Sequence, residues 1–150
     1  MHLLTEQTTA VACSVQAAYR YASNLERFGE WFPGVIAIES ANNLDHAMPG
    51  KEYLETVAIP FRGTRKVKLR VKEAEQDKLL VTEGALAPLM PRMEISFQSA
   101  GAESCQITWR MFSRNNGSLA RFTLVPLARS VINKRAAIGV AKLKEKLEGL

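Results

Sequence analysis

The sequence has the length and composition of one ordinary folded domain. It contains 150 residues, of which 47% are hydrophobic and 23% charged, and 20 basic against 15 acidic side chains give a net charge of +5. These values exclude a disordered chain, a collagen-like chain and a disulfide-dependent scaffold. No apolar run approaches the ~20 residues that span a membrane, and no apolar signal segment follows Met1. We therefore expect a single domain over residues 1–150, located in the cytoplasm.

The N-terminal part of the chain predicts one strand followed by two short helices. Residues 3–12 are rich in Thr, Val and Ala, which favours a strand. Ser14 can cap a helix over residues 15–22, and Asn24 can cap a second helix over residues 25–31. Pro33-Gly34 then ends the helical region, because a proline disfavours helix at the residue before it.

Hydrophobic residues then recur at every second position, which predicts six further strands. The pattern is clearest in the fourth strand of the chain, where Val67, Leu69 and Val71 alternate with basic side chains. Short connections between most of these segments indicate antiparallel pairing. The six predicted strands cover residues 35–40, 51–59, 64–75, 79–85, 89–99 and 105–114.

The spacing of apolar residues becomes helical from about Leu124 to the end of the chain. A stripe on this predicted helix would lie against the concave face of the sheet. We expect its C-terminal half to seal the core and its N-terminal half, residues 124–131, to border any cavity. One early strand, two short helices, six strands and one long helix make an α+β domain. The stripe consists of Ile132, Ala136, Val140, Leu143 and Leu147.

The net positive charge is concentrated in one strand. Residues 61–72 contain six basic side chains and no acidic one, and most of these lie in the segment Arg65–Lys72. No aromatic residues are interleaved with them, so the segment lacks the stacking platform of a single-strand nucleic-acid site. We expect a solvated sheet face and no nucleic-acid partner. Contact of this face with an anionic membrane or an acidic partner is the alternative.

The sequence offers few candidates for catalysis. Neither histidine has a Ser, Cys or Asp at a spacing that suggests a triad, and no cluster of metal ligands or phosphate-binding loop is present. We therefore expect no metal and no cofactor. Cys13 and Cys105 are expected to be buried, reduced thiols. Glu55 and Tyr53 are the weak catalytic candidates, but alternation alone leaves it open whether this side of their strand faces the core or the solvent.

The order of these elements, and a stretch from Tyr19 to Val35, resemble the START-like (SRPBCC) superfamily, also called polyketide cyclase/dehydrase and lipid transport. Members carry a similar stretch, with aromatic residues on the first helix, then Glu-Trp, then Pro-Gly before a valine-rich strand. The closing Leu143–Glu148 also resembles the family's usual end. Two features depart from the pattern: Asn24 stands where Asp is commoner, and Cys13-Ser14-Val15 replaces the usual Ala-Pro.

The resemblance implies a helix-grip fold, in which a curved antiparallel sheet of about seven strands wraps around a long C-terminal helix. It also implies binding or transport of a hydrophobic small molecule, lipid or polyketide-like, in a cavity between sheet and helix. The alternatives are a cyclase/dehydratase-type enzyme that uses the same cavity, and an interaction module that uses the basic sheet face. Large, soft side chains suit such a cavity. The residues expected to line it are Trp31, Phe32, Tyr53, Met90, Met93, Phe97, Trp109, Met111, Phe122 and Leu127.

Overall fold

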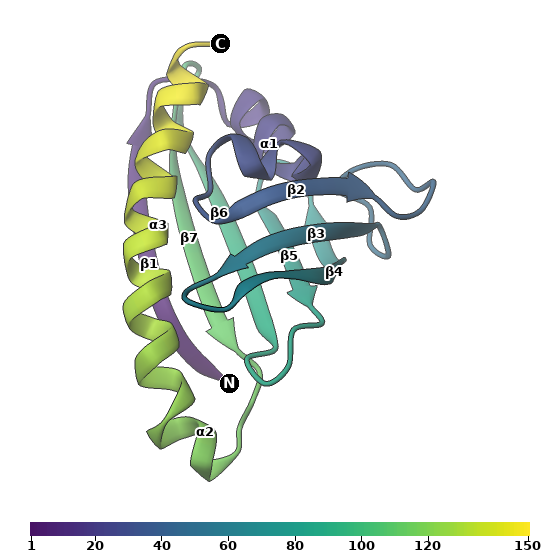
Figure 1. The fold of residues 1–150 in the computed structure, drawn as a ribbon. Helices are drawn as coiled ribbons and strands as arrows, with labels where there is room; N and C mark the ends of the chain where they lie inside the picture. The colour runs from purple at the N-terminus through teal and green to yellow at the C-terminus, as the bar shows by residue number, and fades with distance from the viewer.

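The computed structural model describes all residues from 1 to 150, and its framework is a seven-stranded antiparallel sheet in the order β1-β7-β6-β5-β4-β3-β2. Figure 1 shows the long C-terminal helix α3 lying along one side of the curved sheet, with β1 behind it. The elements are β1 (His2–Val11), α1 (Val15–Ser23), η1 (Leu25–Glu30), β2 (Val35–Ser40), β3 (Glu52–Ile59), β4 (Gly63–Glu75), β5 (Leu79–Gly84), β6 (Pro91–Gly101), β7 (Ser104–Ser113), α2 (Ser118–Phe122) and α3 (Leu124–Glu148).

The predicted α+β helix-grip fold and all seven strands are confirmed. Two local predictions differ from the structure. The second short helix, η1, is a 3-10 helix, and the five-residue helix α2 was not predicted. The side chains of Ser14 and Asn24 cap α1 and η1 as expected, because they accept hydrogen bonds from the backbone N–H groups of Ala17 and Glu26.

The sheet is curved because several strand pairs shift register at irregularities, which bend and twist a strand. Such shifts occur between Leu3 and Thr5 in β1, between Val35 and Ala37 in β2, and after Val71 in β4. As a result β2, β3 and β4 pass across the front of β5, β6 and β7 in Figure 1. The concave side of the sheet is therefore partly covered by its own strands β2, β3 and β4.

Alternation decides which side chains reach this inner face. On β4, Val67, Leu69 and Val71 are buried while the basic residues between them are exposed, as predicted. Cross-strand pairs continue the same face through the sheet. The pairs are Tyr53–Leu69, Glu55–Val67, Val71–Thr82, Thr82–Met93, Ile95–Trp109 and Phe97–Ile107. We call the side of the sheet that carries these residues the inner face.

Helix α3 follows β1 along its whole length. At one end Arg129 donates a hydrogen bond to the Leu3 carbonyl (2.9 Å), and at the other Lys144 donates to the Ala10 carbonyl (2.6 Å). Most of the predicted apolar stripe faces the sheet: Ala136, Val140, Leu143 and Leu147 are buried, and Ile132 is partly buried. Burial of this stripe fixes the helix over the inner face near β1 and β7.

The buried stripe of α3 gives the first prediction. Leu143 is fully buried, so Leu143→Ala should lower the free energy of unfolding by about 2–5 kcal/mol through lost contacts and a cavity. The matched control is Leu127→Ala, because Leu127 on the same helix is 71% exposed. That change should cost about 0.5 kcal/mol or less. Urea denaturation measures both, and equal losses would contradict the assignment of the two faces.

Candidate functional site

The best candidate site is the inner face of the sheet around Glu55 on β3. Period two carries Glu55 to the same face as Tyr53, and both side chains are buried, at 6% and 0% exposure. The inward alternative left open by the sequence is therefore the one the structure adopts. The Cα partners of Glu55 on the neighbouring strands are Ile38 on β2 and Val67 on β4. A carboxyl group thus lies between aliphatic neighbours.

Burial dominates the electrostatics of Glu55. It raises the pKa of this carboxyl to about 7, and no hydrogen bond or neighbouring charge contributes to the shift. The side chain belongs to none of the eight ion pairs in the molecule. The carboxyl has no hydrogen-bond partner in the protein, but its oxygens are not among the completely enclosed polar atoms, so it lies in an apolar setting with slight access to solvent. Near neutral pH this carboxyl can either accept or donate a proton.

Tyr53, two residues before Glu55, has a different environment. Its hydroxyl is hydrogen-bonded to Nδ1 of His46, and the two rings are stacked with centroids 5.7 Å apart. Burial raises the pKa of Tyr53 to about 12. Nε2 of His46 lies 3.7 Å from a carboxylate oxygen of Glu26. The Tyr53 hydroxyl is thus already satisfied by a partner, whereas the Glu55 carboxyl is not.

The contact between His46 and Tyr53 was missed at the sequence level. His46 lies in the eleven-residue segment that joins β2 to β3, and no spacing rule predicts where a segment of this length returns to the fold. Lys51, in the same segment, is also buried: its Nζ donates to the Asn42 carbonyl (2.8 Å) and lies 5.3 Å from the Tyr53 ring centroid. Both residues support Tyr53 from the side of this segment.

A second unpartnered polar group lies on the same inner face. Trp109 on β7 is fully buried, and its indole Nε1 has no hydrogen-bond partner. The Trp109 ring stacks on Phe32, with ring centroids 5.1 Å apart. The inner face therefore offers one orphaned N–H donor in addition to the carboxyl of Glu55. Three of the four residues that pair with these two across the sheet are apolar, namely Ile38, Val67 and Ile95, and the fourth is Gln7 on β1.

The ten residues predicted to line a cavity fall into three groups. Tyr53, Met93, Phe97 and Trp109 are buried on the inner face, and Met111 is packed against the same core. Trp31 and Phe32 are buried where η1 leads into β2. The remaining three lie elsewhere: Met90 is half-buried in the connection between β5 and β6, while Phe122 and Leu127 are 76% and 71% exposed.

Leu127 is exposed because of its position on the helix. Nine residues separate it from Ala136, which corresponds to about two and a half helical turns. The two side chains therefore point to opposite sides of α3, and Ala136 is the one that is buried. Phe122 belongs to the separate helix α2. The structure thus brings neither residue to the inner face, and we leave both out of the site proposed below.

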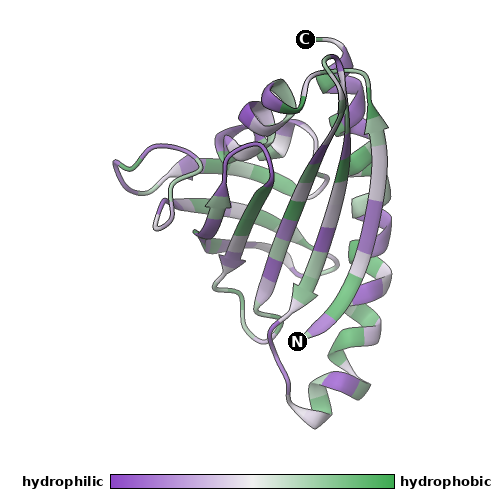
Figure 2. Cartoon of the chain, turned by 180° about the vertical axis from the view of Figure 1, so that it is seen from behind, coloured by the Kyte–Doolittle hydropathy of each residue, from purple (hydrophilic) through white to green (hydrophobic).

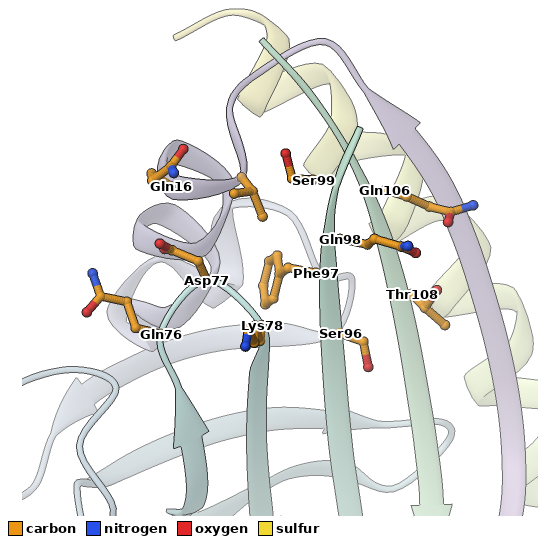
Figure 3. A pocket seen from close by; sticks show the side chains of 11 residues that line it. Gln16, Gln76, Asp77, Lys78, Ser96, Phe97, Gln98, Ser99, Gln106 and Thr108 are labelled. Carbon is orange, nitrogen blue, oxygen red and sulfur yellow. The ribbon is translucent and has the colours of Figure 1, made fainter. Parts of the chain in front are cut away.

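A hollow on the surface of the molecule lies at a different place. It has a volume of about 630 Å³ and lies between α1, the turn that joins β4 to β5, and the ends of β6 and β7. Figure 3 shows that Phe97 points toward α1, whereas Gln106 and Thr108 point away from it. Most of its lining is polar and uncharged, with Asp77 and Lys78 as the charged exceptions. A second hollow on α1, of about 580 Å³, shares part of this lining.

Other features of the structure bear on the expected chemistry. Cys13 and Cys105 are buried free thiols, as predicted. Arg92 lies on the outer face with Glu83 and Glu94 as ion-pair partners at 3.0 and 2.8 Å. No group of three or more His, Cys, Asp or Glu side chains could hold a metal ion. No helix combines the length and hydrophobicity needed to cross a membrane.

The buried carboxyl gives the second prediction. Because the folded-state pKa of Glu55 is raised, the folded protein binds more protons than the unfolded chain between pH 4.5 and about 7. Stability should therefore fall as pH rises through this window, by roughly 3 kcal/mol in total from this group. Glu55→Gln should remove the loss and be more stable than the unmodified protein at pH 8. Urea denaturation across this pH range measures the difference.

The control for this experiment is Glu39→Gln, which changes an exposed carboxylate on the neighbouring strand β2. It should leave the pH dependence of stability unchanged. If Glu55→Gln also leaves the pH dependence unchanged, the carboxyl is solvated in solution and the buried site is wrong.

Comparison with known proteins shows which family the chain belongs to. A family model described as polyketide cyclase/dehydrase and lipid transport matches residues 2–148. No curated protein sequence matches this chain significantly. A START superfamily protein from Mycobacterium smegmatis has a TM-score of 0.69 at 14% identity, with 99% of this chain and 96% of that chain covered.

Two proteins with aromatase/cyclase in their names have a similar fold. The Zhui aromatase/cyclase from Streptomyces sp. R1128 has a TM-score of 0.69 at 15% identity, and the match covers 96% of this chain and 92% of that one. The two-domain aromatase/cyclase StfQ of steffimycin biosynthesis has a TM-score of 0.66 at 14% identity, and the match covers 96% of this chain and 44% of that one. These identities establish a shared fold, and the family model extends over nearly the whole sequence. The chain therefore belongs to the polyketide cyclase/dehydrase and lipid transport family.

Proposed function

We propose that this protein binds a hydrophobic small molecule, lipid or polyketide-like, between the inner face of the sheet and α3. The description of its family, and the aromatase/cyclase names of two proteins with the same fold, support this class of ligand. The inner face is apolar except for a few positions and carries methionine and aromatic side chains, which adapt to flat or flexible ligands. Burial of the ligand's apolar surface would supply most of its affinity.

The observation that carries the proposal is the unpartnered carboxyl of Glu55. A leucine at this position would complete the apolar surface at lower cost, because burial of a carboxyl is unfavourable unless it is hydrogen-bonded. A ligand hydroxyl or carbonyl would supply the missing hydrogen bond. The Nε1–H of Trp109 is a second donor without a partner. The ligand we propose is therefore apolar in its body and carries hydroxyl or carbonyl oxygens.

A second candidate function is proton transfer within the same site, as in a cyclase/dehydratase-type enzyme. The specific observation that favours it is the pKa of Glu55, raised by burial to about 7. A general base or acid is most effective when its pKa lies near the working pH. In its ionised form Glu55 would remove a proton from a carbon flanked by two carbonyl groups, and the neutral carboxyl would return a proton to the oxygen that leaves as water.

Ligand binding is tested by the fluorescence of the two tryptophans. Trp31 and Trp109 are both buried, at 1% and 0% exposure. Titration with the neutral apolar dye N-phenyl-1-naphthylamine should quench tryptophan emission as the dye enters the inner face, and Trp109→Phe should remove most of this change. Ile36→Ser, at an exposed position of β2, is the control and should leave the titration unchanged. Unaltered emission with a panel of apolar dyes would contradict the binding proposal.

Proton transfer is tested separately with a short poly-β-ketone thioester as substrate. Glu55→Gln should lower kcat by at least ~100-fold, the usual effect of losing a general acid or base, with KM changed much less. If Glu55 acts as the base, the rate should rise with pH through about 7 in the unmodified protein. If the protein binds the dye but does not turn over the thioester, the ligand-binding function stands and the proposed enzymatic activity is rejected. Full activity of Glu55→Gln would reject Glu55 as the catalytic group.

A further inference from the structure

An exposed apolar corner is formed by α2 and the first turns of α3. Three large apolar side chains within a stretch of nine residues are mostly exposed to solvent. They are Leu119 and Phe122 on α2 and Leu127 on α3, at 77%, 76% and 71% exposure. Met1 and Leu3, which are 57% and 42% exposed, are hydrogen-bonded to Asn116 just before α2 and to Arg129 on α3. We call these five residues the apolar corner. Figure 2 shows hydrophobic colouring on these two helices, at the end of the molecule where the N-terminus lies.

Specific contacts hold the corner in place. The Met1 amino group donates to Asn116 (2.5 Å), just before α2, and Arg129 in the second turn of α3 donates to the Leu3 carbonyl (2.9 Å). The Asn115 side chain donates to the Pro88 carbonyl (2.8 Å). The apolar side chains therefore project from an anchored support, and their exposure is a property of the fold.

The charge around the apolar corner is of one sign. No acidic residue occurs between Glu103 and Glu145, whereas this stretch contains eight basic residues. Five of these eight take part in no ion pair, and among them are Arg121 on α2 and the exposed Arg129 and Lys134 in the first half of α3. The Arg121 guanidinium lies 5.8 Å from the ring centroid of Phe122, so cation and apolar ring are presented together. Exposed leucine and phenylalanine next to unpaired arginine are typical of surfaces that enter the interface of an anionic bilayer.

We propose that the apolar corner docks on the surface of an anionic lipid membrane. The apolar side chains would enter the interface, and Arg121, Arg129 and Lys134 would contact the acidic headgroups. A second copy of the chain fits less well, because a symmetric contact would bring the same basic residues together. Neither of the two hollows described above includes a residue of α2 or α3, so neither offers a groove for a partner's helix at the apolar corner. In Figure 1, α2 projects from the body of the molecule, which suits contact with a flat surface.

The first experiment separates the contribution of the apolar corner to membrane binding from non-specific adsorption to vesicles. Co-sedimentation with vesicles of phosphatidylcholine and phosphatidylserine should retain the protein, and Leu119→Ser/Phe122→Ser/Leu127→Ser should lower the partition coefficient at least ~10-fold. All three positions are exposed, so the thermal midpoint should stay unchanged, which a melting curve checks.

A matched triple variant serves as its control. Ile36→Ser/Leu44→Ser/Met48→Ser changes three exposed apolar residues on β2 and in the segment that follows it. This variant should bind the vesicles as the unmodified protein does. Equal loss of binding in both triple variants would overturn the assignment to the apolar corner.

The second experiment tests the charge. Arg121→Gln/Arg129→Gln/Lys134→Gln should weaken binding to the phosphatidylserine vesicles by roughly 100-fold, the product of three surface contacts to an anionic leaflet. Vesicles of phosphatidylcholine alone should bind the unmodified protein much more weakly and show little effect of these changes.

Lys66→Gln/Lys68→Gln/Arg70→Gln, on the exposed side of β4, removes equal charge at another place and should change binding only slightly. The proposal is overturned if the phosphatidylserine vesicles do not retain the protein, or if the β4 variant loses as much binding as the variant of the corner. It is also overturned if the serine variant of the corner instead abolishes a dimer seen by sedimentation velocity. None of these outcomes depends on a ligand at Glu55, so they leave the proposed binding function unaffected.

Discussion

The packing of Phe32 connects the parts of this fold. Its ring stacks on Trp109 of β7, with centroids 5.1 Å apart, and on Phe28 of η1, with centroids 5.0 Å apart. On its other side it approaches Gly139 of α3 so closely that a β-carbon there would lie 3.0 Å from the Phe32 ring. The missing side chain of Gly139 thus allows one aromatic ring to contact the sheet, the 3-10 helix and the long helix. Glycine inside a helix costs about 1 kcal/mol relative to alanine, and the close approach gives a reason for it.

This aromatic contact also sets the boundary of the candidate site. Phe32 and Trp31 are buried where η1 leads into β2, and the Phe32 ring contacts Trp109 on β7, whereas Glu55 lies on β3. Arg135 closes the neighbouring side, where its guanidinium packs against Gly34 and donates to the Ala58 carbonyl of β3 (2.9 Å). The long helix is therefore hydrogen-bonded to β1 at one edge of the sheet and to β3 next to the other edge, and Glu55 lies on the strand that Arg135 contacts.

The sequence predicted those features that depend on local periodicity. Alternation of Val67, Leu69 and Val71 located β4 and its buried face, and the spacing of Ala136, Val140 and Leu143 located the buried stripe of α3. The orientation of Glu55 could not be predicted, because both faces of β3 carry enough apolar residues to be the core. Cross-strand pairing with Val67, which is a non-local contact, decides it.

The candidate site was predicted less completely than the fold, for two physical reasons. His46 reaches Tyr53 through a segment without regular structure, whose path depends on contacts such as that of Lys51 with Asn42. Phe122 and Leu127 were grouped with the cavity because they are large and apolar, although size says nothing about direction. For Leu127 the helical period alone places it opposite Ala136, so a stricter use of spacing would have found this.

The pairing of β1 with β7 has a consequence for how the chain acquires its structure. These strands are neighbours in the sheet although His2 pairs with Ser113, so about three-quarters of the sequence lies between them. Contacts of such large sequence separation slow folding, because the entropy of closing the loop is lost before the contacts form. During synthesis β1 leaves the ribosome long before its partner exists, and α3, which rests on β1, comes later still. The hairpins from β2 to β7 can form in order as they emerge, whereas the closing of the sheet by β1 must wait for β7, and its cover must wait for α3.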